Sequence, residues 1–123
     1  MEWKAAELPM PPATGAEPCF KVDAFFPEEY GLDDPEVRSA LALCGGCDLA
    51  RLCMVWSLAH PGMTEAGIWG GTTPYQRRSI RRRLIGRWGQ AGAQEHLRAS
   101  YREALSKFRA RDRDVGFCRQ GSA

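Results

Sequence analysis

The sequence lacks the features of a secreted or membrane-inserted protein. Its first residues contain no apolar core of a signal peptide, and Arg51 interrupts the best candidate for a bilayer-spanning stretch. No alternating run of apolar and polar residues predicts a β-strand, and no internal repeat is apparent. We therefore expect an all-α protein of the cytoplasm that has no membrane partner.

The cysteines are also unsuited to a closed set of disulfides, because their number, five, is odd. In a reducing compartment, grouped cysteines more often bind metals or take part in catalysis than form disulfides. Cys118 lies in the polar C-terminal region and matches no spacing, so we expect a free thiol there. His60 and His96 stand apart from the cysteines, and surface or capping roles are expected for both.

The net charge of +2 conceals an uneven distribution. Residues 1–65 carry 4 basic and 11 acidic side chains, a net charge of −7, whereas residues 66–94 carry 6 arginines and no acid. Residues 95–123 carry 7 basic and 4 acidic side chains. An acidic front and a basic back suggest two kinds of partner, one of them a nucleic acid. The alternative is that the arginines simply solvate a helix face.

Two helices are predicted in the first half of the chain. Asp34 and Pro35 are a typical N-cap and first helical residue, and Gly45-Gly46 would end this helix. Its apolar face holds four residues: Val37, Ala40, Leu41 and Cys44. Asp48 is the expected cap of the second helix, which His60-Pro61-Gly62 would end. Its apolar stripe is Leu49, Leu52, Cys53 and Trp56.

Two more helices are predicted in the second half. Thr73 and Gln76 form a capping box with Pro74 at the first helical position, so the third helix is expected over residues 74–85. Three glycines then predict a loose connection around Trp88: Gly86, Gly89 and Gly92. The fourth helix is amphipathic, with apolar residues at Leu97, Tyr101, Leu105 and Phe108.

Four cysteines have a spacing that indicates metal coordination: Cys19, Cys44, Cys47 and Cys53. Four thiolates complete either a tetrahedral zinc site or an iron–sulfur cluster. Structural zinc sites usually pair two short knuckles, and only Cys44–Cys47 has that spacing, which favours the cluster. The two glycines between this pair would let the backbone approach an inorganic core closely. Two alternatives stay open, a zinc-stabilised DNA-binding module and a disulfide reductase that uses Cys44 and Cys47.

A glycine-rich turn surrounds Trp69, and an arginine-rich segment follows it. The glycines of this turn, Gly67, Gly70 and Gly71, favour an exposed ring, and tryptophan is enriched at binding hot spots. The third helix carries five arginines, which predict phosphate contacts with DNA: Arg77, Arg78, Arg81, Arg82 and Arg83. Like charges four residues apart destabilise an isolated helix, so this density favours a nearby polyanion. Ile80 and Leu84 are expected to pack inward.

Together these residues resemble the WhiB-like proteins of actinobacteria and their phages. The resemblance rests on the cysteine spacing, on Phe25-Phe26-Pro27, on the turn around Trp69 and on the arginine-rich helix, and it covers about residues 19–84. It implies one 4Fe–4S cluster per chain on the four cysteines. It also implies a redox- and nitric-oxide-responsive transcriptional regulator at the nucleoid rather than an enzyme, although disulfide reductase activity has been proposed for cluster-free members.

The same resemblance implies two partners. One is the C-terminal domain of the principal sigma factor of RNA polymerase, with Trp69, Phe25 and Phe26 as contacts. The other is DNA. The minor-groove hook of one subgroup has no counterpart here, because residues 86–89 contain no proline. We expect a monomer with a leader at 1–18, a cluster domain at 19–85, and a linker with an amphipathic helix and tail at 86–123.

Overall fold

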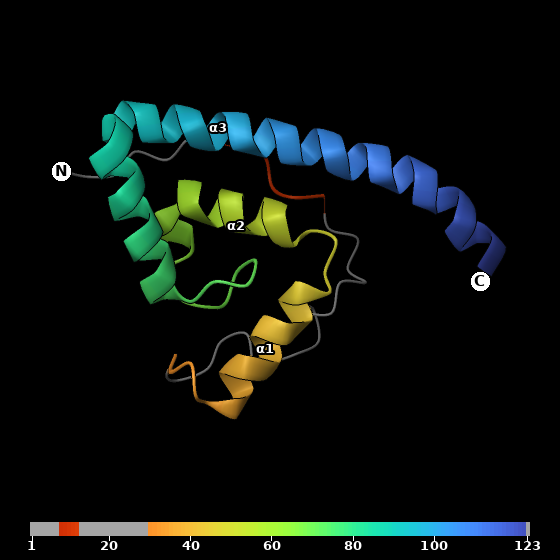
Figure 1. Cartoon of the computed structure of the whole chain (residues 1–123), viewed down its shortest axis with the longest axis horizontal. Helices are drawn as coiled ribbons and strands as arrows, with labels where there is room; N and C mark the ends of the chain where they lie inside the picture. The colour runs from red at the N-terminus through yellow and green to blue at the C-terminus, as the bar shows by residue number, and fades with distance from the viewer. Residues whose placement is uncertain (1–7, 13–29, 123) are drawn as a thin grey trace.

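The computed structural model describes residues 8–12 and 30–122, with the side chains of the last helix up to Arg111. This part of the chain contains three α-helices and one short 3-10 helix, and it contains no strand. The elements are α1 (Pro35–Gly45), α2 (Ala50–Ala59), η3 (Pro61–Met63) and α3 (Pro74–Ser122). Helix α2 lies alongside the long arm of α3, whereas α1 projects away from it (Figure 1). The predicted helical class is confirmed for the described residues.

Helix α1 follows its sequence signals closely. The Asp34 carboxylate accepts a hydrogen bond from the Glu36 amide at 2.8 Å, which satisfies one of the free N–H groups of the first turn. The apolar face buries Val37, Ala40 and Cys44 against Ile68, which comes from the turn before α3. Both the N-cap and the buried face were predicted correctly.

Helix α2 begins one residue later than an N-cap at Asp48 would place it. Its N-cap is Leu49, which makes no side-chain capping hydrogen bond, so the expected cap at Asp48 is wrong. The Cys47 carbonyl accepts from the Ala50 amide at 3.1 Å, and this turn leads the chain into the helix. The predicted stripe is confirmed, because Leu49, Leu52 and Trp56 are buried and Cys53 packs against them.

The end of α2 is closed by His60, as predicted for a capping histidine. Its Nδ1 lies 2.9 Å from the Trp56 carbonyl oxygen, and because a carbonyl only accepts, Nδ1 carries the proton. The ring also stacks on the Trp56 indole, with 4.3 Å between ring centroids. The Thr64 hydroxyl lies 2.9 Å from both the Ser57 and the His60 carbonyl oxygens. Two carbonyls in the last turn of α2, those of Trp56 and Ser57, therefore have partners.

Helix α3 is two helices joined at a single residue. Gly89 has φ 72° and ψ 174°, a conformation that is essentially restricted to glycine. It divides α3 into a first limb (residues 74–88) and a second limb (residues 90–122), which run crosswise in Figure 1. The predicted loose connection over residues 86–92 is thus narrower, because one glycine is enough to turn the chain. Trp88 and His96 stack across this corner with 4.4 Å between centroids.

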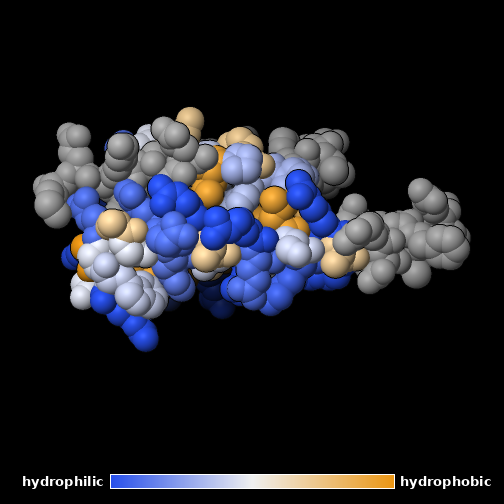
Figure 2. All heavy atoms as spheres, turned by 90° about the horizontal axis from the view of Figure 1, so that it is seen from above, coloured by the Kyte–Doolittle hydropathy of each residue, from blue (hydrophilic) through white to orange (hydrophobic). Residues whose placement is uncertain are grey.

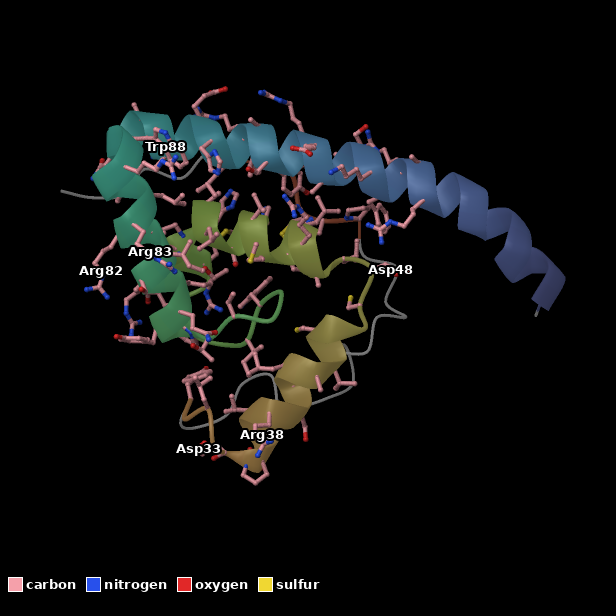
Figure 3. The ribbon with its side chains drawn as sticks, viewed as in Figure 1. Asp33, Arg38, Asp48, Arg82, Arg83 and Trp88 are labelled. Atoms are coloured by element: carbon pink, nitrogen blue, oxygen red, sulfur yellow. The ribbon has the colours of Figure 1, made fainter. Side chains whose placement is uncertain are left out.

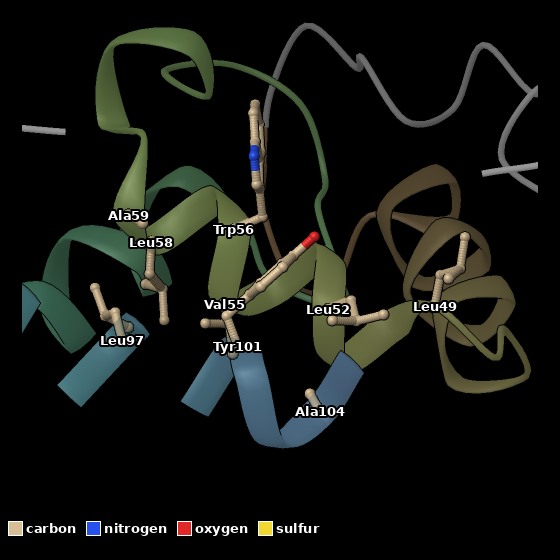
Figure 4. Close-up of a cluster of buried hydrophobic side chains, with 9 residues drawn as sticks. All are labelled: Leu49, Leu52, Val55, Trp56, Leu58, Ala59, Leu97, Tyr101 and Ala104. Atoms are coloured by element: carbon tan, nitrogen blue, oxygen red, sulfur yellow. The ribbon is translucent and has the colours of Figure 1, made fainter. Parts of the chain in front are cut away.

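The main core lies between α2 and the second limb (Figure 4). Of the predicted apolar residues of the second limb, Leu97 and Tyr101 are buried in this core, and Leu105 and Phe108 pack partly against it. Ala104, which was not predicted, is buried there as well. The segment Leu8–Pro12 joins the two helices from outside. Its Leu8 carbonyl accepts from the Trp56 indole at 3.1 Å, and its Pro9 carbonyl accepts from the Tyr101 hydroxyl at 2.6 Å.

The surface seen from above α3 is mostly hydrophilic, with isolated apolar spots (Figure 2). Exposed ion pairs follow the second limb, among them Glu103–Lys107 at 2.9 Å and Glu95–Arg98 at 3.3 Å. Such exposed pairs add little to stability, because water screens the charges. Within residues 8–12 and 30–122 no single helix has the length and apolar character to cross a bilayer. Helices α1 and α2 meet that criterion only as a pair bent by 112°, which buried core helices also do.

Candidate cofactor and interaction site

Three of the four predicted cluster ligands lie in the described part of the chain, around the junction of α1 and α2. Cys44 is in the last turn of α1 and is buried, Cys47 lies in the link, and Cys53 is in the first turn of α2. No disulfide joins these three cysteines to one another. Cys19 and the two phenylalanines, Phe25 and Phe26, lie outside the described residues. The side chain of Cys118 does so as well.

The donor set at this junction consists of thiols, which are the ligands of most iron–sulfur clusters. Within the described residues, no three His, Cys, Asp or Glu side chains come close enough to hold a single metal ion. A cluster is larger than one ion and takes its fourth thiolate from a separate segment, which here would carry Cys19. The link between Cys44 and Cys47 contains only glycines, so no side chain obstructs the approach of a cofactor. The chemistry of the three described thiol donors therefore fits an iron–sulfur cluster.

The turn around Trp69 sits directly on this cysteine junction. The Trp69 amide donates to the Thr72 carbonyl at 3.0 Å, and the Thr72 amide donates back at 2.9 Å, which closes a tight loop. Gly70 has φ 54°, and a Cβ at this position would overlap backbone atoms of Ala50 and Met54 in α2. A Cβ on Gly71 would touch the Cβ of Cys44 at 3.8 Å. At Gly70, only a glycine can pack this closely against α2.

The Trp69 ring is half-buried rather than fully exposed. One face stacks on Trp56, with 5.6 Å between centroids and 28° between the ring planes, and its Nε1 donates to the Ala66 carbonyl at 3.2 Å. The flanking glycines therefore leave part of the ring at the surface while the core supports it from behind. Trp56 was predicted only as a core residue, and its contact with Trp69 has no signal in the sequence because it depends on the path of the turn.

The predicted contact of Arg77 with DNA is wrong. We expected its guanidinium to face DNA, but its relative exposure is 0%. Nη1 donates to the Thr72 carbonyl at 2.6 Å, and Nη2 donates to the carbonyls of Thr64 at 2.9 Å and Gly67 at 2.8 Å. Burial, followed by the charge of Arg81, lowers the pKa of Arg77 to about 10. The physical reason for the error is that a buried arginine can take backbone carbonyls as partners, which a charge count cannot detect.

The other arginines divide between two faces of the first limb. Arg81 is half-buried, and its Nη1 lies 3.4 Å from the Ser57 carbonyl oxygen near the end of α2. Burial, and then Arg78, lower the pKa of Arg81. Arg78, Arg82 and Arg83 are exposed. In Figure 3, Arg82 points away from α2. Three of the five predicted arginines thus remain available at the surface.

Two tyrosines also belong to the site, although the sequence did not indicate either of them as a site residue. The Tyr30 hydroxyl accepts from the Gly67 amide at 2.6 Å and so supports the start of the turn. Tyr101 reaches the site from the second limb. Burial, and then the neighbouring Cys53, raise the pKa of its phenol. Neither contact could be predicted, because each joins segments that are far apart in the sequence.

Comparison with known proteins assigns this arrangement to a class. The sequence model of the family described as Transcription factor WhiB matches residues 13–80, which is more than half of the chain. The matched range holds helices α1 and α2, the three cysteines around the α1–α2 junction and the tryptophan-bearing glycine turn that packs on this junction, and the match indicates a transcription regulator. The chain belongs to the WhiB family.

Several curated relatives match over the same region. The transcriptional regulator WhiB2 of Mycobacterium tuberculosis is 38% identical over 69 residues, which cover 54% of this chain and 71% of the relative. WhiB2 of Mycolicibacterium smegmatis has the same identity, but the match spans only 49% of its length. The transcriptional regulator WhiB of Streptomyces coelicolor is 30% identical over 69 residues, with 54% and 72% covered. No solved structure matches the chain.

Proposed function

We propose that this chain is a redox- and nitric-oxide-responsive regulator of transcription that holds one 4Fe–4S cluster, acts with the principal sigma factor and binds DNA in the cytoplasm. The observation that carries the proposal is the extent of the family match. Residues 13–80 include all four cysteines and the turn around Trp69. That the chain regulates transcription follows from its family. The cluster, the sigma factor and DNA are what we propose in addition.

The cysteines of the α1–α2 junction, with Cys19, are the proposed ligands. An iron–sulfur cluster bound there would supply a redox-active group that reacts with oxygen or nitric oxide. The chain's own contribution is to hold the thiolates and to connect them to the surface. Gly70 packs on the backbone of α2, and Gly71 lies against Cys44, so a shift of the cysteines would reach the turn directly. Trp69 is the residue of that turn at the surface.

The proposed sigma contacts are the outer part of the Trp69 ring and the two phenylalanines Phe25 and Phe26. A tryptophan supported by a rigid core loses little conformational entropy when a partner covers it, which is typical of hot spots. Here the support is Trp56, which is buried and stacked on Trp69. The exposed arginines of the first limb, Arg78, Arg82 and Arg83, are the proposed phosphate contacts.

The cofactor is tested by anaerobic purification with iron and sulfide analysis. We expect about four iron and four sulfide per chain, the composition of a cubane cluster. Serine at Cys19, Cys44, Cys47 or Cys53 should lower the iron content, whereas Cys118→Ser should leave it unchanged. One zinc ion per chain without sulfide would support a zinc-stabilised module instead. Catalytic turnover of disulfides that depends on Cys44 and Cys47 would support a reductase.

The partner is tested with Trp69→Ala against Trp88→Ala, a control with an exposed tryptophan at the corner of α3. Loss of a hot-spot tryptophan should weaken binding to the sigma C-terminal domain by roughly 2–4 kcal/mol. The visible spectrum of the cluster should be the same in both variants. Equal affinities of Trp69→Ala and the wild type, with the cluster intact, would refute the role of Trp69.

A further inference from the structure

The most unusual buried group in the described part of the chain is the guanidinium of Arg77. It is fully buried, yet it forms no ion pair with any described carboxylate. Its hydrogen-bond partners are three backbone carbonyls and the Thr72 hydroxyl, the last at 3.2 Å. Its Nε has no partner among the described residues. A buried charge is costly unless it is well hydrogen-bonded, so these contacts must be maintained for Arg77 to stay inside.

The three carbonyls come from three points of one loop. Thr64 follows η3, Gly67 begins the glycine-rich turn, and Thr72 ends it. Trp69 lies between the second and third points. Because a guanidinium is planar and presents several donors in a fixed fork, one arginine can hold all three points in a defined arrangement. A lysine ammonium has no such fork and cannot reproduce this geometry.

The turn is therefore held from two sides. On one side, Gly70 and Gly71 pack against α2 and Cys44. On the other side, Arg77 ties the ends of the turn to the first limb. The first contact involves the elements that carry the cysteines, whereas none of the hydrogen bonds of Arg77 is made to a cysteine. Because two different sets of contacts hold the turn, its path depends on Arg77 as well as on the cysteine junction.

The geometry points to Arg77 as a positioning residue for partner docking, which holds Trp69 in the orientation that the sigma domain recognises and makes no contact with DNA. The inference rests on the proposed function only in taking the sigma C-terminal domain as the partner. Arg77 acts through the turn and is not itself a contact residue, because a fully buried side chain cannot touch a partner. The inference thus gives Arg77 a different role from its exposed neighbour Arg78, which is a proposed phosphate contact.

The experiment compares Arg77→Met and Arg77→Lys with Arg78→Met as the matched control. Methionine keeps an unbranched apolar stem but has no donor, so Arg77→Met should weaken binding to the sigma C-terminal domain by about tenfold or more, which corresponds to about 1.4 kcal/mol. Arg77→Lys should be intermediate, because it restores some but not all of the hydrogen bonds. Arg78→Met should bind the sigma domain as the wild type does. The cluster spectrum should be unchanged in all three variants.

Amide hydrogen exchange gives a second, local measurement. The amides of Trp69 and Thr72 bond to each other's carbonyls across the turn, so both should lose protection in Arg77→Met and, to a smaller extent, in Arg77→Lys. The Cys53 amide, bonded to the Leu49 carbonyl inside α2, should keep its protection. If Arg77→Met does not fold, the exchange pattern and sigma affinity of Arg77→Lys decide the question.

DNA binding by the full chain separates the two roles of arginine. A phosphate contact changes the slope of log affinity against log salt by about 0.9. Arg77→Met should leave this slope unchanged, whereas Arg78→Met should reduce it. A reduced slope in Arg77→Met, or wild-type sigma affinity with unchanged protection of Trp69 and Thr72, would overturn the inference. If Trp69→Ala also binds normally, it is the proposed partner contact that fails; if only the Arg77 variants bind normally, the positioning role alone fails.

Discussion

The two limbs of α3 are continuous in sequence but have opposite relations to the core. The first limb begins with a reciprocal capping box, in which Thr73 N–H donates to the Gln76 side chain at 2.9 Å, and its outer face is a row of arginines. The second limb inserts Leu97, Tyr101 and Ala104 into the main core. The family match ends at residue 80, before the second limb begins. The part of α3 that completes the core therefore lies beyond the family match.

The folded unit extends further along the chain than the family match does. The matched region supplies the cysteines, the turn and the start of the arginine-rich limb. Helix α2, which carries Cys53, packs on residues that lie beyond that region. A chain cut at the end of the family match would expose the apolar side of α2. The following changes test how far the two limbs differ.

The largest effect is expected from Leu97→Ala in the second limb. Leu97 is 2% exposed and packs in the main core, so its truncation should lower the free energy of unfolding by about 2–5 kcal/mol. The matched control is Ser106→Ala, an exposed position on the same limb, which should change it by no more than about 0.5 kcal/mol. Urea denaturation of both variants measures the difference. Equal stabilities would mean that the second limb does not support the core.

Gly89→Ala tests the corner between the limbs. Alanine is strained at φ 72° and ψ 174°, so this change should cost about 1–3 kcal/mol. Gly86→Ala is the control, because Gly86 lies inside the helix and a Cβ there meets nothing within 4 Å. It should stabilise the protein by roughly 0.5–1 kcal/mol. If thermal unfolding shows that Gly89→Ala lowers the stability and Gly86→Ala raises it, the conformation of Gly89 sets the corner of α3. A stabilising Gly89→Ala would contradict this role.

Tyr101→Phe tests the link between the second limb and the segment Leu8–Pro12. The change keeps the buried ring but removes the donor to the Pro9 carbonyl, and it should cost about 0.5–1.5 kcal/mol. Tyr75→Phe is the control, since Tyr75 is 66% exposed on the first limb, and it should have little effect. Chemical denaturation measures both. Indistinguishable variants would show that the bond to Pro9 adds nothing to stability.

The smallest effect on stability is expected at the outer face of the first limb. Replacing Arg78, Arg82 and Arg83 by alanine should change the free energy of unfolding by no more than about 0.5 kcal/mol per site. The same change should flatten the salt dependence of DNA binding by about three units if each arginine meets a phosphate. The loss should be similar on different DNA sequences, because phosphates carry no sequence information. An unaltered slope would mean that these arginines only solvate the face of the helix.

Local signals in the sequence predicted the elements better than their junctions. Asp34, Pro35 and the capping box at Thr73 fixed two helix starts, because N-caps act within a few residues. The cap at Asp48 failed, since the turn at Cys47 delays α2. The corner was placed within a few residues but drawn too long, because three glycines were available and only the structure shows which one leaves the helical region.

The site was predictable in composition and unpredictable in orientation. The sequence identifies Trp69 and its glycines, but it does not show that Trp56 stands behind the ring. It identifies an arginine-rich helix, but helical spacing alone cannot tell that Arg77 turns inward while Arg78 faces water. The decisive contacts join distant segments, as do those of Tyr30 with Gly67 and of Tyr101 with Pro9. Such contacts depend on the tertiary fold.

The bonds of Arg77 also have an evolutionary consequence. The side chain reads backbone carbonyls at Thr64 and Gly67, which every amino acid possesses. Glu65 and Ala66 lie between these anchor points and are exposed, so their identities are free to drift among descendants of this chain. The number of residues between the anchors is not free, because one inserted or deleted residue would carry a carbonyl out of reach. Between Thr64 and Gly67, selection therefore acts on the number of residues far more than on their identity.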